Sequence, residues 1–133
     1  MMNMNLFKKK DKKKKISKVF VYGLLRVGER LATQFDRFRT GAEPASVTGT
    51  LLDLEDFTGL IEVGDTIIEG ELQAYGKRMD KVMRMMDGVE GYCGKDNPIN
   101  LFIRDEVDVT LKDGSIERAY IYYFNVDLLK EES

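Results

Sequence analysis

The chain contains no histidine and no tryptophan, and Cys93 is the single cysteine among its 133 residues. Hydrolysis by Ser-His-Asp or Cys-His sites and zinc chemistry of the HExxH type are therefore excluded, because each requires an imidazole. One thiol can neither close a disulfide within the chain nor build a zinc site from several thiolates. Without an imidazole beside it, Cys93 is expected to be a reduced thiol with no nucleophilic role, in a reducing compartment.

Long hydrophobic runs are also missing, since no segment approaches the roughly 20 apolar residues that cross a bilayer. The early lysines are followed by mixed sequence rather than by the apolar core of a signal peptide. We therefore expect a cytoplasmic protein with no membrane span. A content of 43% hydrophobic and 33% charged residues is typical of one globular domain with a single core.

Charge is distributed unevenly along the chain. Residues 1–15 contain seven lysines and one aspartate, a charge of +6. Because the formal net charge of the whole chain is −2, the remaining residues carry −8. This pattern predicts a disordered lysine-rich tail over 1–15 and a folded, acidic domain over 16–133. The tail is either a solvated extension, a localisation signal, an anionic-membrane tether or a weak polyanion contact, and a lysine cluster alone fits each of these. The acidic domain itself does not favour nucleic-acid binding.

Most of the domain reads as strands, separated by glycine, proline and aspartate. The segments with β-branched residues and partial alternation are 19–22, 46–54, 60–63, 66–75, 101–111 and 116–124. We expect a turn at Gly64-Asp65 between the third and fourth, and a hairpin around Lys112-Asp113-Gly114 between the last two. Gly70 inside its strand suggests a bulge or a tight bend.

Two segments are expected to be helical. A short helix or turn is expected over 29–38, before Gly41 and Pro44. Residues 77–87 show helical periodicity that ends at Gly88. The methionines and valine on one face of this second helix are interpreted as core packing, because flexible thioethers fill irregular gaps well.

Two further patterns suggest a site. In Val19-Phe20-Val21-Tyr22-Gly23-Leu24-Leu25-Arg26-Val27-Gly28 an apolar strand runs into a glycine turn, which leaves backbone N–H groups free to hold an anion. In Met86-Asp87-Gly88-Val89-Glu90-Gly91-Tyr92 the carboxylate of Glu90 stands between glycines. Such a cradle with one placed carboxylate suits proton transfer on a small acidic substrate, and it needs no metal and no cofactor.

Five segments, in this order and spacing between residues 18 and 126, carry a resemblance to a known family: YGLLRVG, GELQAY, MDGVEGY, FIRDEVDV and AYIYYFN. They resemble the gamma-glutamylcyclotransferase-like family, which includes the AIG2-like proteins and gamma-glutamylamine cyclotransferase. The resemblance implies an α+β fold, a small mixed β-barrel with flanking helices.

The resemblance also implies a function. Members of this family cyclise a γ-glutamyl group, so that its own α-amine attacks the side-chain amide, giving 5-oxoproline and a free amine or amino acid without a cofactor. Glu90 matches the catalytic glutamate, and Tyr22, Gly23, Leu24 and Leu25 match the loop whose backbone holds the substrate. Tyr122 of AYIYYFN keeps its match and is a candidate site residue.

This chemistry explains why a carboxylate and a loop of backbone donors would occur together. One carboxylate can take a proton from the attacking ammonium and return it to the departing amine. Partial burial of Glu90 beside Val89 and Tyr92 is expected to raise its pKa toward neutrality. The amides from Gly23 to Leu25 would hold the α-carboxylate and keep the substrate curled.

Two departures from the family pattern support a second hypothesis. Leu24 stands where many members have threonine or serine, and Phe102 stands where members often have tyrosine, so two hydroxyls are missing. The alternative function is a catalytically silent binding module of the same fold that recognises a small acidic metabolite. The sequence leaves open whether Asp87 ends the helix or supports Glu90, and which γ-glutamyl amine or peptide is the substrate.

Overall fold

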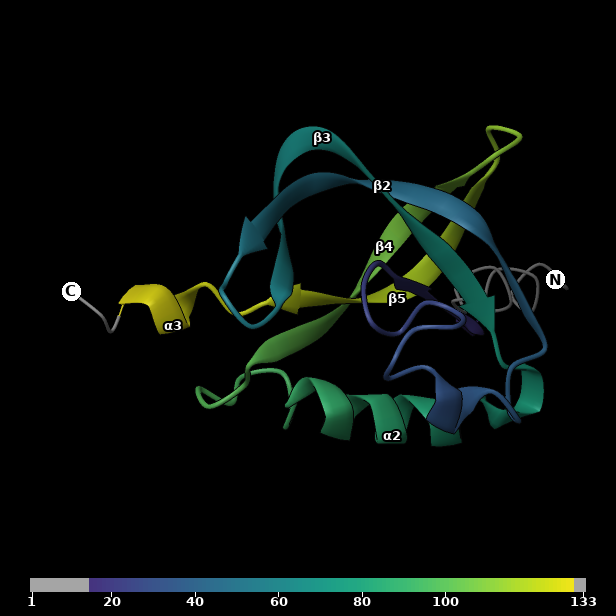
Figure 1. The fold of residues 1–133 in the computed structure, drawn as a ribbon, viewed down its shortest axis with the longest axis horizontal. Helices are drawn as coiled ribbons and strands as arrows, with labels where there is room; N and C mark the ends of the chain where they lie inside the picture. The colour runs from purple at the N-terminus through teal and green to yellow at the C-terminus, as the bar shows by residue number, and fades with distance from the viewer. Residues whose placement is uncertain (1–14, 131–133) are drawn as a thin grey trace, which may run out of the picture.

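The computed structural model describes residues 15–130. Within that range the strands close into a barrel in the order β1-β3-β2-β4-β5 (Figure 1). Their bounds are β1 Lys18–Val21, β2 Gly41–Asp53, β3 Thr58–Ala74, β4 Phe102–Leu111 and β5 Ile116–Phe124. The pairs are antiparallel except β1 with β5, where Val19 lies opposite Tyr120 in parallel. The expected small mixed barrel, and with it the α+β fold, is confirmed.

Short helices flank the barrel. Helix α2, Met79–Glu90, follows the 3-10 turn η2, Gly76–Arg78, and lies along one side of the barrel (Figure 1). The turn η1, Thr33–Phe35, falls in the expected 29–38 region, and α3, Asp127–Lys130, follows β5. The prediction that the main helix ends at Gly88 is wrong. It continues to Glu90 because Gly91, at φ 68°, adopts the left-handed conformation that terminates helices.

Strand β3 is one continuous strand, so the predicted turn at Gly64-Asp65 is wrong. Gly49 of β2 pairs with Thr66, while the next residue, Thr50, pairs with Ile61. Residues 62–65 therefore bulge out of the ladder, and the Thr50 hydroxyl donates to the Val63 carbonyl at 2.6 Å. A bulge of this kind bends a strand and increases its twist, which helps a sheet to close.

Strand β2 begins at Gly41, earlier than the expected residue 46. Pro44 lies inside it, opposite Glu71 of β3, and β2 pairs with β4 only at Ala45 and Ser46. Proline lacks an N–H, and it is tolerated in a strand where one edge is unpaired. The sequence pattern predicts a break at Pro44, because the sequence does not show which edge of a strand is unpaired.

Gly70 is explained by close backbone approach rather than by a bulge. A Cβ atom there would lie 2.4 Å from the Val21 carbonyl oxygen and 2.6 Å from the Phe20 ring. The β2–β3 register shift occurs elsewhere, between Gly49 and Thr50. Glycine is therefore needed where the end of β1 lies against β3.

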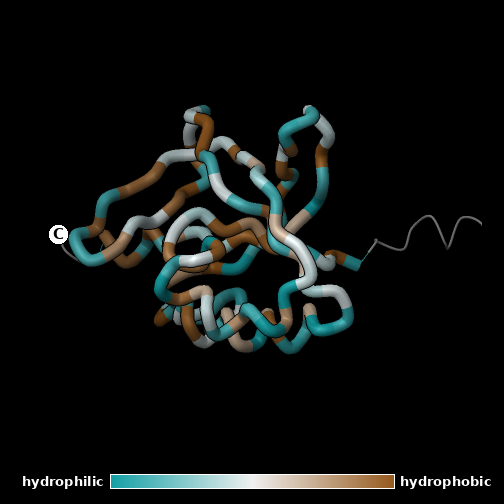
Figure 2. Tube along the Cα trace, turned by 45° about the vertical axis from the view of Figure 1, so that its right-hand side comes forward, coloured by the Kyte–Doolittle hydropathy of each residue, from teal (hydrophilic) through white to brown (hydrophobic). Residues whose placement is uncertain are grey.

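Alternate residues of β1 face two different clusters. Val19 and Val21 pack with α2, which buries Met79, Val82, Met83 and Met86, so the interpretation of these residues as core is confirmed. Phe20 packs on the other side with Leu72, Ile121 and further strand residues. Figure 2 shows hydrophobic and hydrophilic residues alternating along the helical segment below the barrel. The end of β1 is thereby fixed beside α2.

The predicted hairpin of residues 101–111 and 116–124 is confirmed by the pairing of β4 with β5. The predicted tail, residues 1–15, lies outside the described residues except for Lys15, whose ammonium group contacts Asp80 at 3.2 Å. Among the helices of the described part of the chain, none has the length and apolar character to cross a membrane.

Candidate active site

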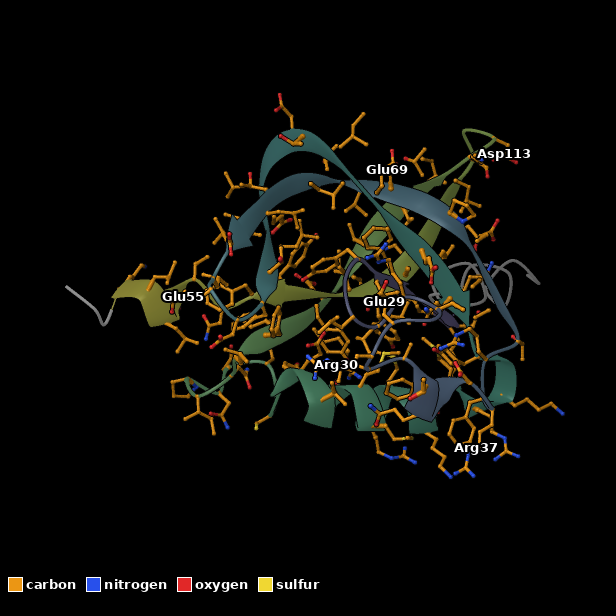
Figure 3. The ribbon with its side chains drawn as sticks, in the orientation of Figure 1. Glu29, Arg30, Arg37, Glu55, Glu69 and Asp113 are labelled. Atoms are coloured by element: carbon orange, nitrogen blue, oxygen red, sulfur yellow. The ribbon has the colours of Figure 1, made fainter. Side chains whose placement is uncertain are left out.

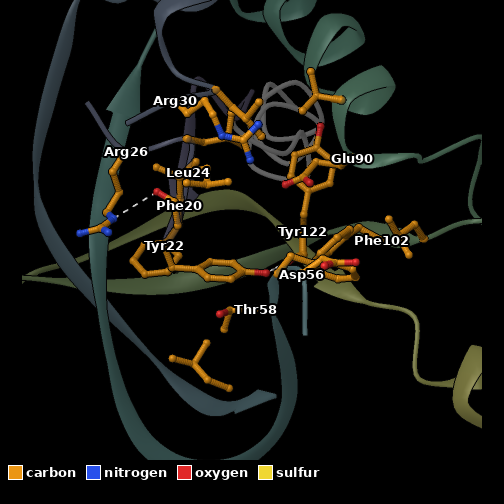
Figure 4. Close-up of a pocket in the computed structure, with 18 residues that line it drawn as sticks. Phe20, Tyr22, Leu24, Arg26, Arg30, Asp56, Thr58, Glu90, Phe102 and Tyr122 are labelled. Carbon is orange, nitrogen blue, oxygen red and sulfur yellow. Dashed lines mark hydrogen bonds between the residues drawn. The ribbon is translucent and has the colours of Figure 1, made fainter. Parts of the chain in front are cut away.

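A cavity of about 630 Å³ opens where the loop after β1, the end of α2, the β2–β3 connection and the start of β4 meet (Figure 4). All the sequence-predicted site residues line it: Tyr22, Gly23, Leu24, Leu25, Glu90 and Tyr122. The structure thus brings together residues that are separated by up to 100 positions in the chain.

In the loop after β1, backbone carbonyls accept hydrogen bonds from the loop itself, while several backbone N–H groups stay unpaired within the described residues. The Gly23 carbonyl accepts from Arg26 N at 3.0 Å, and the Leu24 carbonyl accepts from Leu31 N at 3.0 Å. Within residues 15–130, no protein acceptor is bound by the backbone N–H groups of Gly23, Leu24 or Leu25. Three unpaired N–H groups beside a cavity suit an anionic ligand.

A buried relay from β3 holds this loop in place. Gln73 is fully buried, and its amide nitrogen donates to the Leu25 carbonyl at 2.9 Å and to Glu71 Oε1 at 3.0 Å. Its amide oxygen accepts from the Tyr75 hydroxyl at 2.7 Å, and Glu71 Oε1 also accepts from Val27 N at 2.9 Å. Glu71, Gln73 and Tyr75 are alternate residues of the GELQAY segment, and the sequence alone gives no sign of this relay.

Glu90 is the last residue of α2, and Gly91 turns the chain immediately after it. Burial raises the pKa of Glu90 to about 7. Its carboxylate has no hydrogen bond or ion pair to any residue in the range 15–130. A carboxylate that is poorly hydrated and unpaired, with a pKa near neutrality, can both accept and return a proton.

Asp87, which the sequence left undecided, ties the end of α2 to the hairpin. Its Oδ1 atom accepts from the Tyr122 hydroxyl at 2.6 Å, and its Oδ2 atom lies 3.2 Å from Nη1 of Arg104. The Arg104 guanidinium lies 5.5 Å from the Tyr92 ring and 5.1 Å from the Tyr120 ring. Asp87 is one helical turn before Glu90, so these bonds also fix the position of Glu90.

The two site tyrosines contribute walls rather than free hydroxyls. Tyr122 is 2% exposed, and its pKa is raised by burial and then by its bond to Asp87. The Tyr22 hydroxyl donates to the Tyr122 carbonyl at 2.9 Å and accepts from Leu60 N at 3.2 Å (Figure 4). Burial also raises the pKa of Tyr22. The Tyr122 hydroxyl is therefore occupied by its bond to the Asp87 carboxylate and does not stand free at the rim of the cavity.

The two departures from the family pattern have structural explanations. Leu24 lines the cavity, its backbone N–H has no acceptor among the described residues, and this donor does not depend on the side chain. Phe102 is buried in an aromatic cluster, 5.8 Å from the Phe57 ring and 5.9 Å from the Phe124 ring. A tyrosine hydroxyl in such a cluster would need its own hydrogen-bond partner.

Two arginines of the loop after β1 line the cavity, and sequence reasoning missed the second of them, Arg30. Arg26 is bound to the Gly23 carbonyl at 3.2 Å and to Glu29 at 3.7 Å. Arg30 lines the cavity, and its guanidinium forms no ion pair or hydrogen bond with the described residues. Figure 3 shows Arg30 near the middle of the molecule and Arg37 at its lower edge, away from the barrel. No sequence signal separates these arginines, because the direction of each depends on the loop.

Within residues 15–130 no group of three or more Cys, Asp or Glu side chains is arranged to hold a metal ion. Cys93 is exposed, and it is not among the residues that line the cavity.

Comparison with known proteins supplies the family. Residues 19–133 match the family described as "Gamma-glutamyl cyclotransferase, AIG2-like". This chain belongs to that family. One curated relative is the "Gamma-L-glutamyl-butirosin B gamma-glutamyl cyclotransferase" of Niallia circulans. It is 28% identical over 110 residues, which are 82% of this chain and 67% of the relative.

Solved structures support the gamma-glutamyl cyclotransferase fold. YkqA from Bacillus subtilis superposes with a TM-score of 0.59 at 18% identity over 88% of this chain and 43% of YkqA. The chain therefore spans less than half of that protein. A structure described as gamma-glutamyl cyclotransferase gives a TM-score of 0.50 at 10% identity, covering 82% of this chain and 66% of the other.

Proposed function

We propose that this family member is a γ-glutamyl cyclotransferase that converts a γ-glutamyl amine or peptide to 5-oxoproline and a free amine. The observation that carries the proposal is the unpaired Glu90 carboxylate, with a pKa of about 7, in the same cavity as three unpaired backbone N–H groups. Family membership supports the same reaction class.

In the proposed reaction the substrate's α-carboxylate binds the N–H groups of Gly23, Leu24 and Leu25, with the charge of Arg30 nearby. Glu90 takes a proton from the α-ammonium, and the free amine attacks the side-chain carbonyl carbon. A C–N bond forms within the ring as the original amide C–N bond breaks, and Glu90 passes the proton it holds to the departing nitrogen. The second proton, which the ring nitrogen loses as it becomes the lactam N–H, follows through Glu90, so the amine leaves as an ammonium ion and Glu90 is again a carboxylate. The enzyme's main gain is orientation, because nucleophile and electrophile belong to one molecule.

The direct test is the release of 5-oxoproline from a panel of γ-glutamyl amines and γ-glutamyl dipeptides by the purified chain. We expect release from at least one member, with an equal amount of free amine. Binding of 5-oxoproline or glutamate without turnover of any panel member would contradict the proposal. That result would favour the binding module, for which the missing hydroxyls at Leu24 and Phe102 are the sequence argument.

The pH dependence of kcat/KM provides a second test. We expect its acidic limb to have a midpoint near pH 7, because the base form of Glu90 is lost as the pH falls through its raised pKa. At higher pH the rate should fall again, because a substrate that arrives as the free amine brings no proton for Glu90 to pass to the departing nitrogen. Initial rates from pH 4 to 10 would measure both limbs, and an acidic midpoint near 4.5 would show that buried Glu90 is not the titrating group.

A further inference from the structure

Positive and negative side chains lie on different sides of the cavity, and this separation affects which departing amine the cavity favours. We propose that Asp56 is a specificity-determining residue that favours γ-glutamyl amides whose departing amine carries a second, positively charged nitrogen. This inference rests on the proposed function, since it concerns the amine that the cyclisation releases.

Asp56 is held in position by an ordered connection between β2 and β3. Leu54 N donates to the Phe57 carbonyl at 2.9 Å, and Asp56 N donates to the Leu54 carbonyl at 2.9 Å. The Phe57 ring packs 5.8 Å from Phe102 and 6.1 Å from Phe124. The backbone of Asp56 is therefore fixed next to a packed aromatic cluster, and the residue lines the cavity.

The Asp56 carboxylate is available to a ligand. It is exposed, and within the described residues it has no ion pair and no side-chain hydrogen bond. Among the described residues lining the cavity, only Asp56 and Glu90 carry carboxylates. The lining arginines, Arg26 and Arg30, belong to the loop after β1, and in Figure 4 they lie across the cavity from Asp56.

This polarity orients a γ-glutamyl substrate. The γ-glutamyl half, common to all such substrates, carries the α-carboxylate and is drawn to the N–H groups and arginines of the loop. The departing half then extends toward the wall formed by Leu51, Phe57 and Asp56. A carboxylate on that half would meet a like charge, while an ammonium group would meet an opposite one.

Three amides of matched length test the inference. Their departing amines are 1,4-diaminobutane, pentylamine and 5-aminopentanoate, which end in an ammonium, a methyl and a carboxylate group. We expect kcat/KM to fall in that order, with about a tenfold difference between the first and the last, because exposed charge pairs are weak. Added salt should reduce the difference.

Asp56→Asn should bring the three values within about twofold of one another. Glu55→Gln is the matched control, since Glu55 precedes Asp56 in the same turn and does not line the cavity. The parent order should survive in this control. Because Asp56 is exposed, Asp56→Asn should fold as the parent does, and thermal unfolding would verify this.

The outcomes separate this inference from the proposed function. Equal kcat/KM for the three amides in the parent, or an unchanged order in Asp56→Asn, would overturn the role of Asp56 and leave cyclotransfer intact. Absence of 5-oxoproline from all three, and from the wider γ-glutamyl panel, would overturn the proposed function and this inference with it.

Discussion

Glu90→Gln is expected to lower kcat by about a hundredfold to ten-thousandfold. Glutamine keeps the shape of the side chain and removes the group that accepts and returns the proton, and general acid-base catalysis contributes roughly 10² to 10⁴ in rate. KM should change little, because the substrate's α-carboxylate is proposed to bind the loop after β1 and not Glu90. Steady-state 5-oxoproline release measures both constants, and Glu69→Gln, an exposed glutamate on β3, is the control.

The same variant should be more stable than the parent at alkaline pH. Glu90 has a folded-state pKa of about 7 against an ordinary value of 4.5, so folding favours its protonated form. The carboxylate therefore destabilises the fold progressively as the pH rises from about 4.5 to about 7, and the cost is absent below that window. We expect Glu90→Gln to gain roughly 1 to 3 kcal/mol at pH 8 and almost nothing at pH 4.

Thermal unfolding at the two pH values checks the stability prediction. A variant that is inactive and more stable at pH 8 would separate catalysis from folding, since unfolding cannot explain its loss of activity. Full activity in Glu90→Gln would rule out the proposed proton transfer. An equal effect on stability at pH 4 and pH 8 would show that the ionised carboxylate is not the source of the destabilisation.

Gln73→Leu is expected to raise KM by at least about tenfold with kcat within a few-fold of the parent. The substitution keeps the side-chain volume but removes the donor to the Leu25 carbonyl and the acceptor of the Tyr75 hydroxyl. The loop that presents the N–H groups would lose its support, while Glu90, on α2, would keep its own. An effect confined to KM indicates lost binding shared by substrate and transition state.

The inhibition constant of 5-oxoproline should rise by the same factor, because this product retains the carboxylate that the loop is proposed to hold. Stability should fall by about 2 to 4 kcal/mol, since buried partners are left unpaired, so assays belong well below the unfolding temperature. Gln34→Leu is the matched control, because its amide makes an exposed bond to Leu31 in the same loop. Unchanged KM in Gln73→Leu would show that the relay does not position the loop.

Local patterning predicted the elements that local interactions determine. The methionine face of α2 and the β4–β5 hairpin follow from periodicity and turn residues, and the structure confirms both. The ends of elements were less predictable, because Gly88 is tolerated inside the helix while Gly91 terminates it. The sequence predicts a turn where residues 62–65 bulge, since both features use glycine and aspartate and differ only in the partner strand.

The site residues that lie in recognisable sequence segments can be predicted from the sequence. Those that belong to the site only through tertiary contacts cannot. The segments YGLLRVG and MDGVEGY indicate the loop from Tyr22 to Leu25 and Glu90, and both line the cavity. Asp56 and Arg30 were missed because exposed charges are common and their directions depend on tertiary structure. The hydrogen bonds of Gln73 cannot be predicted from the neighbouring sequence, since its partner Leu25 lies 48 positions away.

The parallel pairing of β1 with β5 also constrains how the protein folds. β1 has only four residues, and its neighbours in the barrel are β3 and β5, which lie far away in the sequence. Contacts of such high sequence separation form late and slow the folding of small domains. The loop after β1 and the wall residue Tyr122 meet only at this closure. A nascent chain whose fifth strand is still within the ribosome therefore has no complete cavity.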